Sequence, residues 1–281
     1  MVSKKFDFRP DSVGYWTEVK LEIVKKYAAA YATILSKQPG IRRFIYIDGF
    51  AGSGKVWSED GRAEIPGSVE NALAIKPPFS EFHLIDLDKN KAAQLKALQE
   101  QNKSVRVYEG NCNSILLEEV FPRCKYGDFA RGLCLLDPYG LDVDWDVLEA
   151  AGKLGTVEIF YNFMIMDANR NVLWRNPDKV SESQKKRMDK VWGDRSWIDA
   201  VYVEQPTLFG SQPEKVDNEV VAEAFRRRLV EKAGFKYVPK PMPMRNSNGA
   251  IVYFLFFASG NSTGGKIVGE IFEKYRKMGV Q

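Results

Sequence analysis

An apolar segment that runs straight into a glycine-rich turn constrains this chain more than any other feature. Residues 45–54 read Ile-Tyr-Ile-Asp-Gly-Phe-Ala-Gly-Ser-Gly. The apolar part predicts a buried strand, and glycine lets the backbone of the turn approach a ligand closely. A second apolar segment, residues 82–86, follows after about 30 residues and ends in Asp86, which is the spacing of a nucleotide- or nucleoside-binding βαβ unit. An acid at that position suits a ribose diol.

Several ligands fit such a turn. The spacing from Gly49 to Lys55 matches a phosphate-binding loop, but Val56 stands where that loop needs a hydroxyl for Mg²⁺. Residues 57–67 are polar and rich in glycine, proline and acids, so no helix begins at the lysine to hold an anion. The pattern therefore favours a nucleoside-type ligand such as S-adenosylmethionine. A dinucleotide, a nucleoside triphosphate and a purely structural turn remain alternatives.

Helical and extended segments alternate along the first part of the chain. An amphipathic helix at 16–36 precedes predicted strands at 42–48, 82–86, 105–109, 132–137 and 156–162, with helices at 69–76, 89–102, 113–120 and 145–151 between them. Continuous apolar strands that alternate with helices predict a parallel sheet covered on both faces.

The last part of the chain has a different pattern. We expect a helix at 217–233, and strands at about 235–242 and 250–258 around the turn residues 246–249. A parallel sheet that ends in an antiparallel strand is typical of class I methyltransferases, whereas dehydrogenase sheets do not need one. The predicted fold is therefore α/β, with a Rossmann-like, mostly parallel sheet of seven strands, a helix before it and a helical insert.

Length and composition indicate one main domain. The 281 residues, 44% of them hydrophobic, can bury a full core. We expect a helical extension at 1–40 and a methyltransferase domain at 41–281, with the insert at about 166–214. The three cysteines lack metal-site spacing, and no apolar run is long enough to span a membrane. The odd cysteine count without a secretory signal favours the cytoplasm, and we expect no metal.

A set of short motifs carries a family resemblance. They are Trp16 with Lys20, residues 46–54, residues 67–68, Asp86 with Asp88, residues 110–113 and residues 136–140. In these motifs the chain resembles the three-Cys-motif partner proteins (TcmP) of the S-adenosylmethionine-dependent methyltransferase superfamily. The family is named for a partner protein with three cysteines, so the resemblance implies such a partner. The cysteines of this chain are not that motif.

The resemblance also implies how a methyl donor is held. The expected donor-binding residues are Asp48, Gly49, Phe50, Gly52, Gly54, Asp86, Asn111 and Cys112. Asp48 would meet the ammonium of the methionine part, and Asp86 the ribose hydroxyls. Related enzymes have Gly-Asp after the third strand where this chain has Gly110-Asn111, so an uncharged amide oxygen is expected to face the adenine amine.

Asp137-Pro138-Tyr139-Gly140 follows the fourth predicted strand, at the edge where open α/β sheets bind ligands. The sequence resembles the Asp-Pro-Pro-Tyr loop of amino-methylating nucleic-acid enzymes. The aspartate and the proline carbonyl can both accept N–H bonds from an exocyclic amine, and Tyr139 can stack on the base. We therefore predict N-methylation of a base amine, adenine N6 or guanine N2, in DNA or RNA. A plain strand-ending turn is the alternative.

The residues expected to bind substrate are less clearly marked. Asn162 and Arg170 follow the fifth strand, and Lys185, Lys186 and Arg187 lie on a predicted helix among tryptophans, as on a nucleic-acid surface. Neighbouring acids dilute this charge, and tryptophans more often lie in a core. The run 226–228 of three arginines is expected on a solvated helix face.

Two other functions stay open. A methyltransferase-like partner or binding protein without catalysis would explain Asn111 and the single proline in the loop, and a nucleotide hydrolase would require Mg²⁺-dependent ATP binding. The only histidine, His83, lies in an apolar strand and is expected to be a satisfied core residue.

Overall fold

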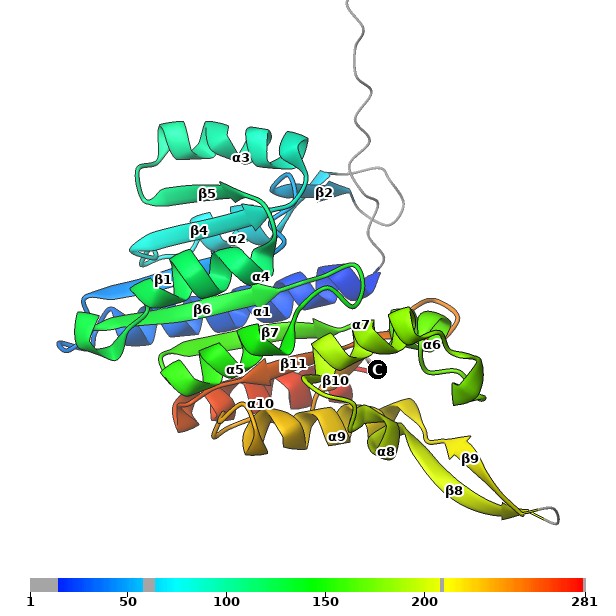
Figure 1. Cartoon of the computed structure of the whole chain (residues 1–281). Coiled ribbons are helices and arrows are strands. Elements are labelled where there is room, and N and C mark those ends of the chain that lie inside the picture. The colour runs from blue at the N-terminus through cyan, green and yellow to red at the C-terminus, as the bar shows by residue number, and fades with distance from the viewer. Residues whose placement is uncertain (1–14, 58–63, 208–209, 280–281) are drawn as a thin grey trace, which may run out of the picture.

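A seven-stranded sheet forms the centre of the computed structural model, which describes residues 15–57, 64–207 and 210–279 (Figure 1). Its strands are β1 (Arg43–Asp48), β4 (Glu81–Asp86), β5 (Val105–Glu109), β6 (Ala130–Leu136), β7 (Val157–Phe163), β10 (Met242–Arg245) and β11 (Ile251–Ala258). They lie in the order β10-β11-β7-β6-β1-β4-β5. The strands from β7 to β5 are parallel, whereas β11 is antiparallel to both of its neighbours. The predicted fold class is confirmed.

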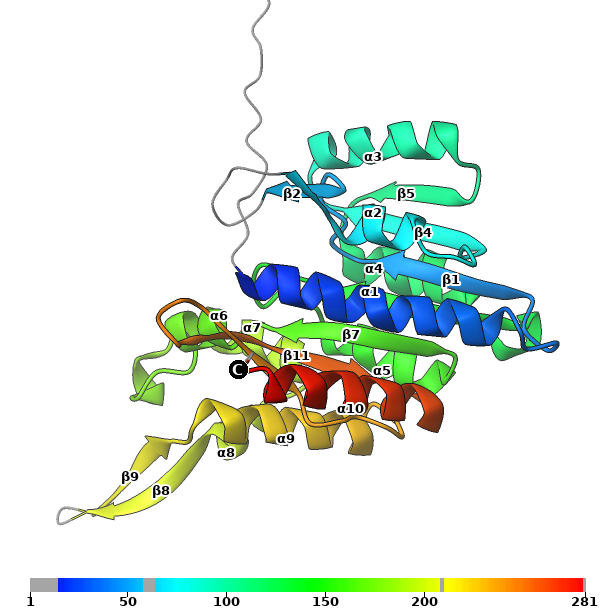
Figure 2. The same cartoon turned by 180° about the vertical axis from the view of Figure 1, so that it is seen from behind.

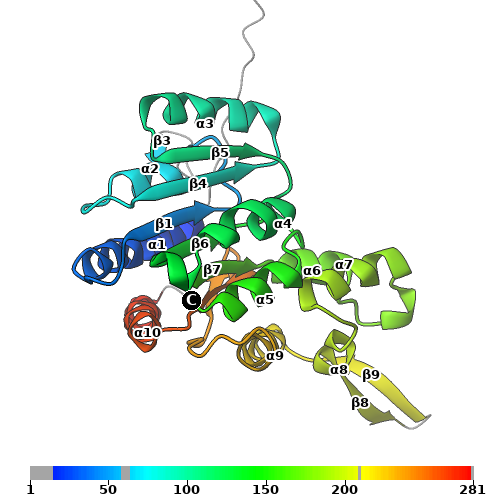
Figure 3. The ribbon, with the colours of Figure 1, turned by 60° about the vertical axis from the view of Figure 1, so that its left-hand side comes forward.

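Helices cover both faces of the sheet, because its central strands are apolar on both sides. One face packs against α1 (Tyr15–Leu35), α2 (Ser68–Leu73), α3 (Lys89–Gln101) and α10 (Ser262–Lys277). Figure 2 shows α1 and α10 lying across this face. The other face packs against α4 (Cys112–Ile115), the π-helical turn Leu116–Val120, α5 (Trp145–Leu154) and α9 (Asn218–Glu231). Figure 3 shows the two helical layers on opposite sides of the strands.

The strand order reverses at β1, which fixes where a ligand crevice opens. From β1 the chain goes outward to β4 and β5, then returns to add β6 and β7 on the other side of β1. The connections that leave β1 and β6 therefore diverge at the carboxyl ends of these strands. Such a switch point is where open α/β sheets bind their ligands.

The edge strand β10 begins later than the sequence suggests. We expected a strand at 235–242, but β10 runs from Met242 to Arg245, and before it only the isolated bridge between Tyr237 and Ser259 joins this segment to a neighbour. Pro239 and Pro241 lack the N–H that a ladder needs, so the apolar pattern of this segment serves packing and not pairing. The antiparallel hairpin of β10 and β11 is confirmed.

Two short hairpins were not predicted. β2 (Lys55–Trp57) pairs with β3 (Glu64–Pro66) after the glycine turn. The segment 166–214 contains α6 (Ile165–Asn171), α7 (Glu182–Trp192) and α8 (Trp197–Val201), but it is not wholly helical. It ends in the hairpin of β8 (Tyr202–Thr207) and β9 (Gly210–Lys215), which projects from the body of the molecule (Figure 1).

The first helix packs on the sheet with α2 and α10, in the same hydrophobic cluster. A boundary at residue 40 between an extension and the main domain stays a prediction.

No helix among the described residues is long and apolar enough to cross a membrane.

Candidate functional site

Asp48 ends β1 and is completely buried. Its Oδ1 accepts the Phe50 N–H at 3.1 Å, and its Oδ2 lies 3.5 Å from the Tyr46 hydroxyl, which donates to it. Burial raises the pKa of Asp48 to about 6, and the nearby Asp137 carboxylate adds to this, although hydrogen bonds from Ser68 and Phe50 and the charge of Lys20 oppose it. A carboxylate held here without a full counter-charge is suited to meet a cationic group.

The glycine turn lies between β4 and β6. The Gly49 N–H donates to the Leu135 carbonyl at 2.9 Å, and the Ala51 N–H donates to the Ile85 carbonyl at 2.9 Å. A side chain at Gly49 would place Cβ 3.0 Å from Leu136 Cδ2. Gly52 has a φ of 63°, which favours glycine. The turn therefore presents bare backbone at the switch point.

Asp86 ends β4 and is fixed by backbone donors. Its Oδ2 accepts the Gly52 N–H at 2.8 Å, which ties it to the glycine turn, and its Oδ1 accepts the Asp88 N–H at 2.8 Å. Each carboxylate oxygen has further lone pairs, so Asp86 can still accept from two hydroxyls. Leu87 is 75% exposed beside it. Sequence reasoning missed this apolar platform, and only its position next to Asp86 could have indicated it.

Asn111 and Cys112 lie where α4 begins. The Asn111 Oδ1 accepts the Asn113 N–H at 2.8 Å, so the amide oxygen that was expected to face an adenine amine caps the helix. Cys112 is buried, and burial raises the pKa of its thiol to about 12. Its Cβ lies 3.8 Å from the position that a Cβ on Gly49 would take, so Cys112 packs against the glycine turn.

Three elements converge on Asp137, just after β6. Lys20 on α1 forms an ion pair with Asp137 Oδ2, and the Asn162 Nδ2 on β7 donates to Oδ1. Lys20 is 4% exposed. The sequence motifs included Lys20, but its role was missed because 117 positions separate it from Asp137. The signal was a lysine on the apolar side of the first helix, next to Val19 and one turn before Ile23.

Asn162 is fully buried, and its Oδ1 has no hydrogen-bond partner within residues 15–57, 64–207 and 210–279. An unpartnered buried acceptor is uncommon and costs about 1–3 kcal/mol. Its amide is already oriented by Asp137. The Asn162 Oδ1 is therefore an enclosed, unsatisfied acceptor beside Asp137.

Tyr139 extends outward beyond this corner. Pro138 is buried, whereas Tyr139 is 73% exposed, with the Lys91 Nζ 5.4 Å from the centre of its ring. The loop is anchored by Asp167 on α6, whose Oδ2 accepts the Leu141 N–H at 3.1 Å. The loop therefore presents an exposed aromatic side chain at the sheet edge, and its catalytic role stays a prediction beside the plain-turn alternative.

The predicted substrate-binding cations are largely bonded to acids. Arg187 donates to Asp167 Oδ2 at 3.2 Å, and Lys185 lies 3.5 Å from Glu182. Arg170 and Lys186 are exposed. The tryptophans of α7 and α8, Trp192 and Trp197, are buried in the core. The structure therefore leaves less free positive charge on the insert than its sequence suggests.

The described ranges contain no cluster of histidine, cysteine or acidic side chains that could hold a metal ion.

Comparisons with known proteins bear on the fold. No protein-family model and no curated protein matches the chain. Among solved structures, a Legionella pneumophila protein is similar with a TM-score of 0.53 and 13% sequence identity over 90% of each chain. At this identity the likeness shows a shared fold alone.

Two further structures are more distant. A putative methyltransferase from Thermobifida fusca has a TM-score of 0.41 and 12% identity, over 85% of this chain and 80% of its own. An S-adenosylmethionine-dependent methyltransferase from Clostridium acetobutylicum has the same TM-score and identity, over 85% of this chain and 91% of its own. These scores are too low to carry an argument about function. The resemblance to TcmP proteins stays a prediction.

Proposed function

We propose that the protein is an S-adenosylmethionine-dependent methyltransferase. The observation that carries the proposal is the meeting of Asp48, the bare glycine turn and Asp86 at the switch point of a class I sheet. A buried acid, exposed backbone and a fixed ribose acceptor are the partners that such a donor needs. The missing hydroxyl at Val56 argues against a nucleoside triphosphate.

The residues present fit this donor. Asp48 would hold the ammonium of the donor, and Asp86 would hold its ribose. The backbone of the turn from Gly49 to Gly54 would lie against the donor. Leu87 would pack on the adenine, because it is exposed next to Asp86. Asn111 is the poorest match, since its amide oxygen already caps α4.

We further propose that the acceptor is the exocyclic amine of a base in nucleic acid, adenine N6 or guanine N2. The bound donor supplies an electrophilic methyl group. Lys20 and Asn162 orient Asp137, whose remaining lone pairs can accept an N–H of the amine and stabilise the charge that develops on nitrogen. Tyr139 can stack on the base.

Two proposals about context accompany this function. The TcmP-like motifs support a partner protein with a three-cysteine motif. The cysteines are buried and form no disulfide, which supports a reducing compartment such as the cytoplasm.

A catalytically silent, methyltransferase-like binding protein is the second candidate. Both carboxylate oxygens of Asp137 already bond to protein donors, and Asn111 serves as a helix cap. A protein that only holds the donor nucleoside, or a partner, could retain this arrangement without turnover.

Two measurements separate these candidates. Calorimetric titration with S-adenosylmethionine tests donor binding, and tritium-methyl transfer to DNA, tRNA, rRNA and protein pools tests catalysis. We expect binding at one site and label in a nucleic-acid pool. Binding without label in any pool, with or without a partner protein, would support the silent candidate. Binding of Mg²⁺-ATP with no donor binding would overturn both in favour of a hydrolase.

A further inference from the structure

A groove of about 600 Å³ lies between α9 and the edge strand β10, away from the residues described above. Four cations line it, Arg227, Lys240, Arg245 and Arg276, together with the two acids Glu219 and Glu223. The groove therefore carries an excess of positive charge.

The two acids already have cationic partners. Glu219 accepts from Arg245 at 3.3 Å, and Glu223 accepts from the Arg226 guanidinium at 2.7 and 2.8 Å. By contrast, Arg227 and Lys240 are exposed and form no ion pair with any residue in the part of the chain that the structure describes. The hydrogen bond from Arg226 lowers the pKa of Glu223 and the charges of Arg227 and Lys240 add to this, but neither of these two side chains is held in an ion pair among the described residues, so both can meet a ligand.

The three consecutive arginines of α9 do not share one solvated face. Arg226 bonds to Glu223, and Arg228 lies over the Trp145 ring and bonds to Asp194. Of these three arginines, Arg227 alone is exposed and lines the groove. The structure thus separates two structural arginines from one that is available for binding.

One end of the groove reaches the edge of the sheet that carries the proposed active site. β10 is antiparallel to β11, which is antiparallel to β7, so Arg245 at the end of β10 lies at the same edge as Asp137. Three strand spacings separate β10 from β6, or about 14 Å. A chain molecule that enters the active site can therefore continue into the groove.

We propose that this groove binds the sugar–phosphate backbone of a single-stranded nucleic acid next to the methylated base. The inference rests on the proposed function. Guanidinium groups match phosphate oxygens in pairs, and a single strand presents its base amine without the cost of flipping the base out of a duplex. Val220, 48% exposed, and Pro243 add an apolar surface against which sugars and bases can lie.

An acidic peptide fits the groove less well. A peptide gains affinity at a sheet edge by adding a strand, which needs free backbone N–H groups on the edge strand. Pro241 and Pro243 remove such donors from this segment. Charge complementarity without strand addition favours a phosphate chain.

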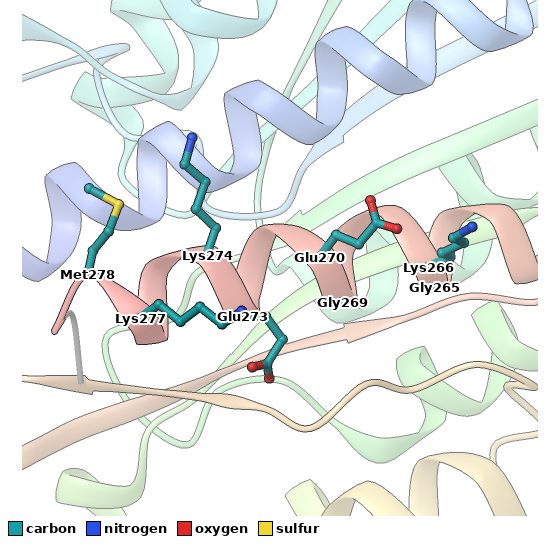
Figure 4. A pocket seen from close by; sticks show the side chains of 8 residues that line it. All are labelled: Gly265, Lys266, Gly269, Glu270, Glu273, Lys274, Lys277 and Met278. Carbon is teal, nitrogen blue, oxygen red and sulfur yellow. The ribbon is translucent and has the colours of Figure 1, made fainter.

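The outer face of α10 offers a matched control surface. A shallow depression there is lined by Lys266, Lys274 and Lys277 together with Glu270 and Glu273, so its charges are more nearly balanced (Figure 4). Lys266 and Lys277 are exposed, as Arg227 and Lys240 are. Neutralising either pair changes the net charge by the same amount.

The test compares a groove variant, Arg227→Gln with Lys240→Gln, and a control variant, Lys266→Gln with Lys277→Gln. Fluorescence anisotropy with labelled oligouridylate and oligothymidylate is measured over a range of KCl concentrations. Loss of two phosphate contacts should lower the magnitude of the log–log salt slope by about 1.4, and weaken binding roughly 25-fold at 0.1 M salt. The control variant should stay close to wild type.

Several outcomes would overturn the groove assignment. They are equal losses in both variants, no loss in the groove variant, no oligonucleotide binding by the wild type, or a groove-dependent affinity for polyglutamate alone. Donor titration and methyl transfer are run on the same proteins. Normal donor binding and transfer with an unaffected oligonucleotide affinity in the groove variant would reject the groove and leave the proposed function intact. Failure of the wild type to bind donor would reject the function, whatever the anisotropy shows.

Discussion

The two ends of the sheet hold acidic side chains in different surroundings. At the amino end, Glu81 accepts from Arg43 at 2.9 Å and from Arg123 at 3.3 Å, and lies 3.2 Å from His83. At the carboxyl end, Asp48 is buried without a full counter-charge, and the Asn162 Oδ1 lacks a partner among the described residues. The protein supplies Glu81 with Arg43, Arg123 and His83 as partners, although the Arg123 Nε itself has no hydrogen-bond partner among the described residues. Asp48 has no ion pair within the described ranges.

The pKa values reflect this difference. Burial alone would raise the pKa of Glu81, but hydrogen bonds from Arg43 and His83 and the charge of Arg123 hold it at about 2. Burial raises the pKa of Asp48 to about 6. An acid whose surroundings favour its charge stabilises the fold, and one whose surroundings oppose its charge is a candidate for binding a ligand. A raised pKa alone does not decide this, since burial also raises the pKa of Glu158 near the amino end of β7, where Tyr27 and Ser259 donate to it. The comparison favours a structural role for Glu81 and fits the proposed donor-binding role of Asp48.

Asp137→Asn should have the largest effect on activity. Loss of the carboxylate removes the group that holds the amine and its developing charge, so we expect methyl transfer to fall about 100- to 1,000-fold. Donor affinity in calorimetry should be unchanged. A transfer rate equal to wild type would remove Asp137 from catalysis.

Asp137→Asn also leaves the buried Lys20 ammonium without its ion-pair partner. Lost stability must therefore be separated from lost catalysis. The double variant Lys20→Met, Asp137→Asn should recover part of the thermal stability, because it removes the unpaired charge. It should not recover transfer. Recovery of both thermal stability and methyl transfer would mean that Asp137 serves only the fold.

Glu81→Gln should lower the free energy of unfolding by about 1–2 kcal/mol, because it leaves Arg43 and Arg123 without their shared, partly buried counter-ion. Urea denaturation gives the value, and the exposed Glu100→Gln serves as control. The folded protein should bind donor as the wild type does. A change in donor affinity without loss of stability would break the proposed contrast between Glu81 and Asp48.

Asp86→Ala should weaken donor binding about 100-fold, since two hydroxyl bonds to a carboxylate are worth about 3 kcal/mol together. Asp88→Ala is the matched control. Asp88 accepts from the N–H groups of Asn90 and Lys91 as the cap of α3, so its loss should lower stability slightly and leave donor affinity unaltered. Equal losses of affinity in both variants would exclude a specific role for Asp86.

The pH dependence of donor binding should show the smallest effect. Only ionised Asp48 attracts an ammonium, and with a pKa of about 6 the carboxylate is about one-tenth ionised at pH 5. We expect calorimetric affinity to fall about tenfold between pH 7 and pH 5. Asp48→Asn should bind weakly and show no such dependence.

The effect of Asp48 on stability has the opposite sign. Its folded pKa lies above the value of 3.8 for a free aspartate, so the folded state binds the proton more tightly. Asp48 therefore favours folding most at low pH, and this contribution is lost as the pH rises through about 6. Stability curves of wild type and Asp48→Asn should diverge in that range, and parallel curves would contradict the raised pKa.

The central strands could be predicted because they are continuous apolar segments, and β5 has the expected bounds. The edge strand β10 was misplaced because the apolar spacing of residues 235–242 also suits an unpaired packed segment. The hairpin β8–β9 was missed because its strands are mostly polar and exposed, so no hydrophobic period marks them. The strands β2 and β3 have three residues each, too few to show a period.

The candidate site divides in the same way. Asp48 and Asp86 could be proposed from sequence because each ends a recognisable strand, and the structure brings both to the glycine turn. The ion pair of Lys20 with Asp137 could not be proposed from the sequence, because it depends on how α1 crosses the sheet. His83 was predicted to be a satisfied core residue, and its bonds to Tyr108 and Glu81 confirm this.

A crystal structure with S-adenosylhomocysteine, the spent donor, tests the central claim most directly. We predict the ammonium at Asp48, the glycine turn against the ligand and the ribose hydroxyls on Asp86. A ligand bound elsewhere, or a magnesium-bound nucleoside triphosphate in its place at the glycine turn, would contradict the account.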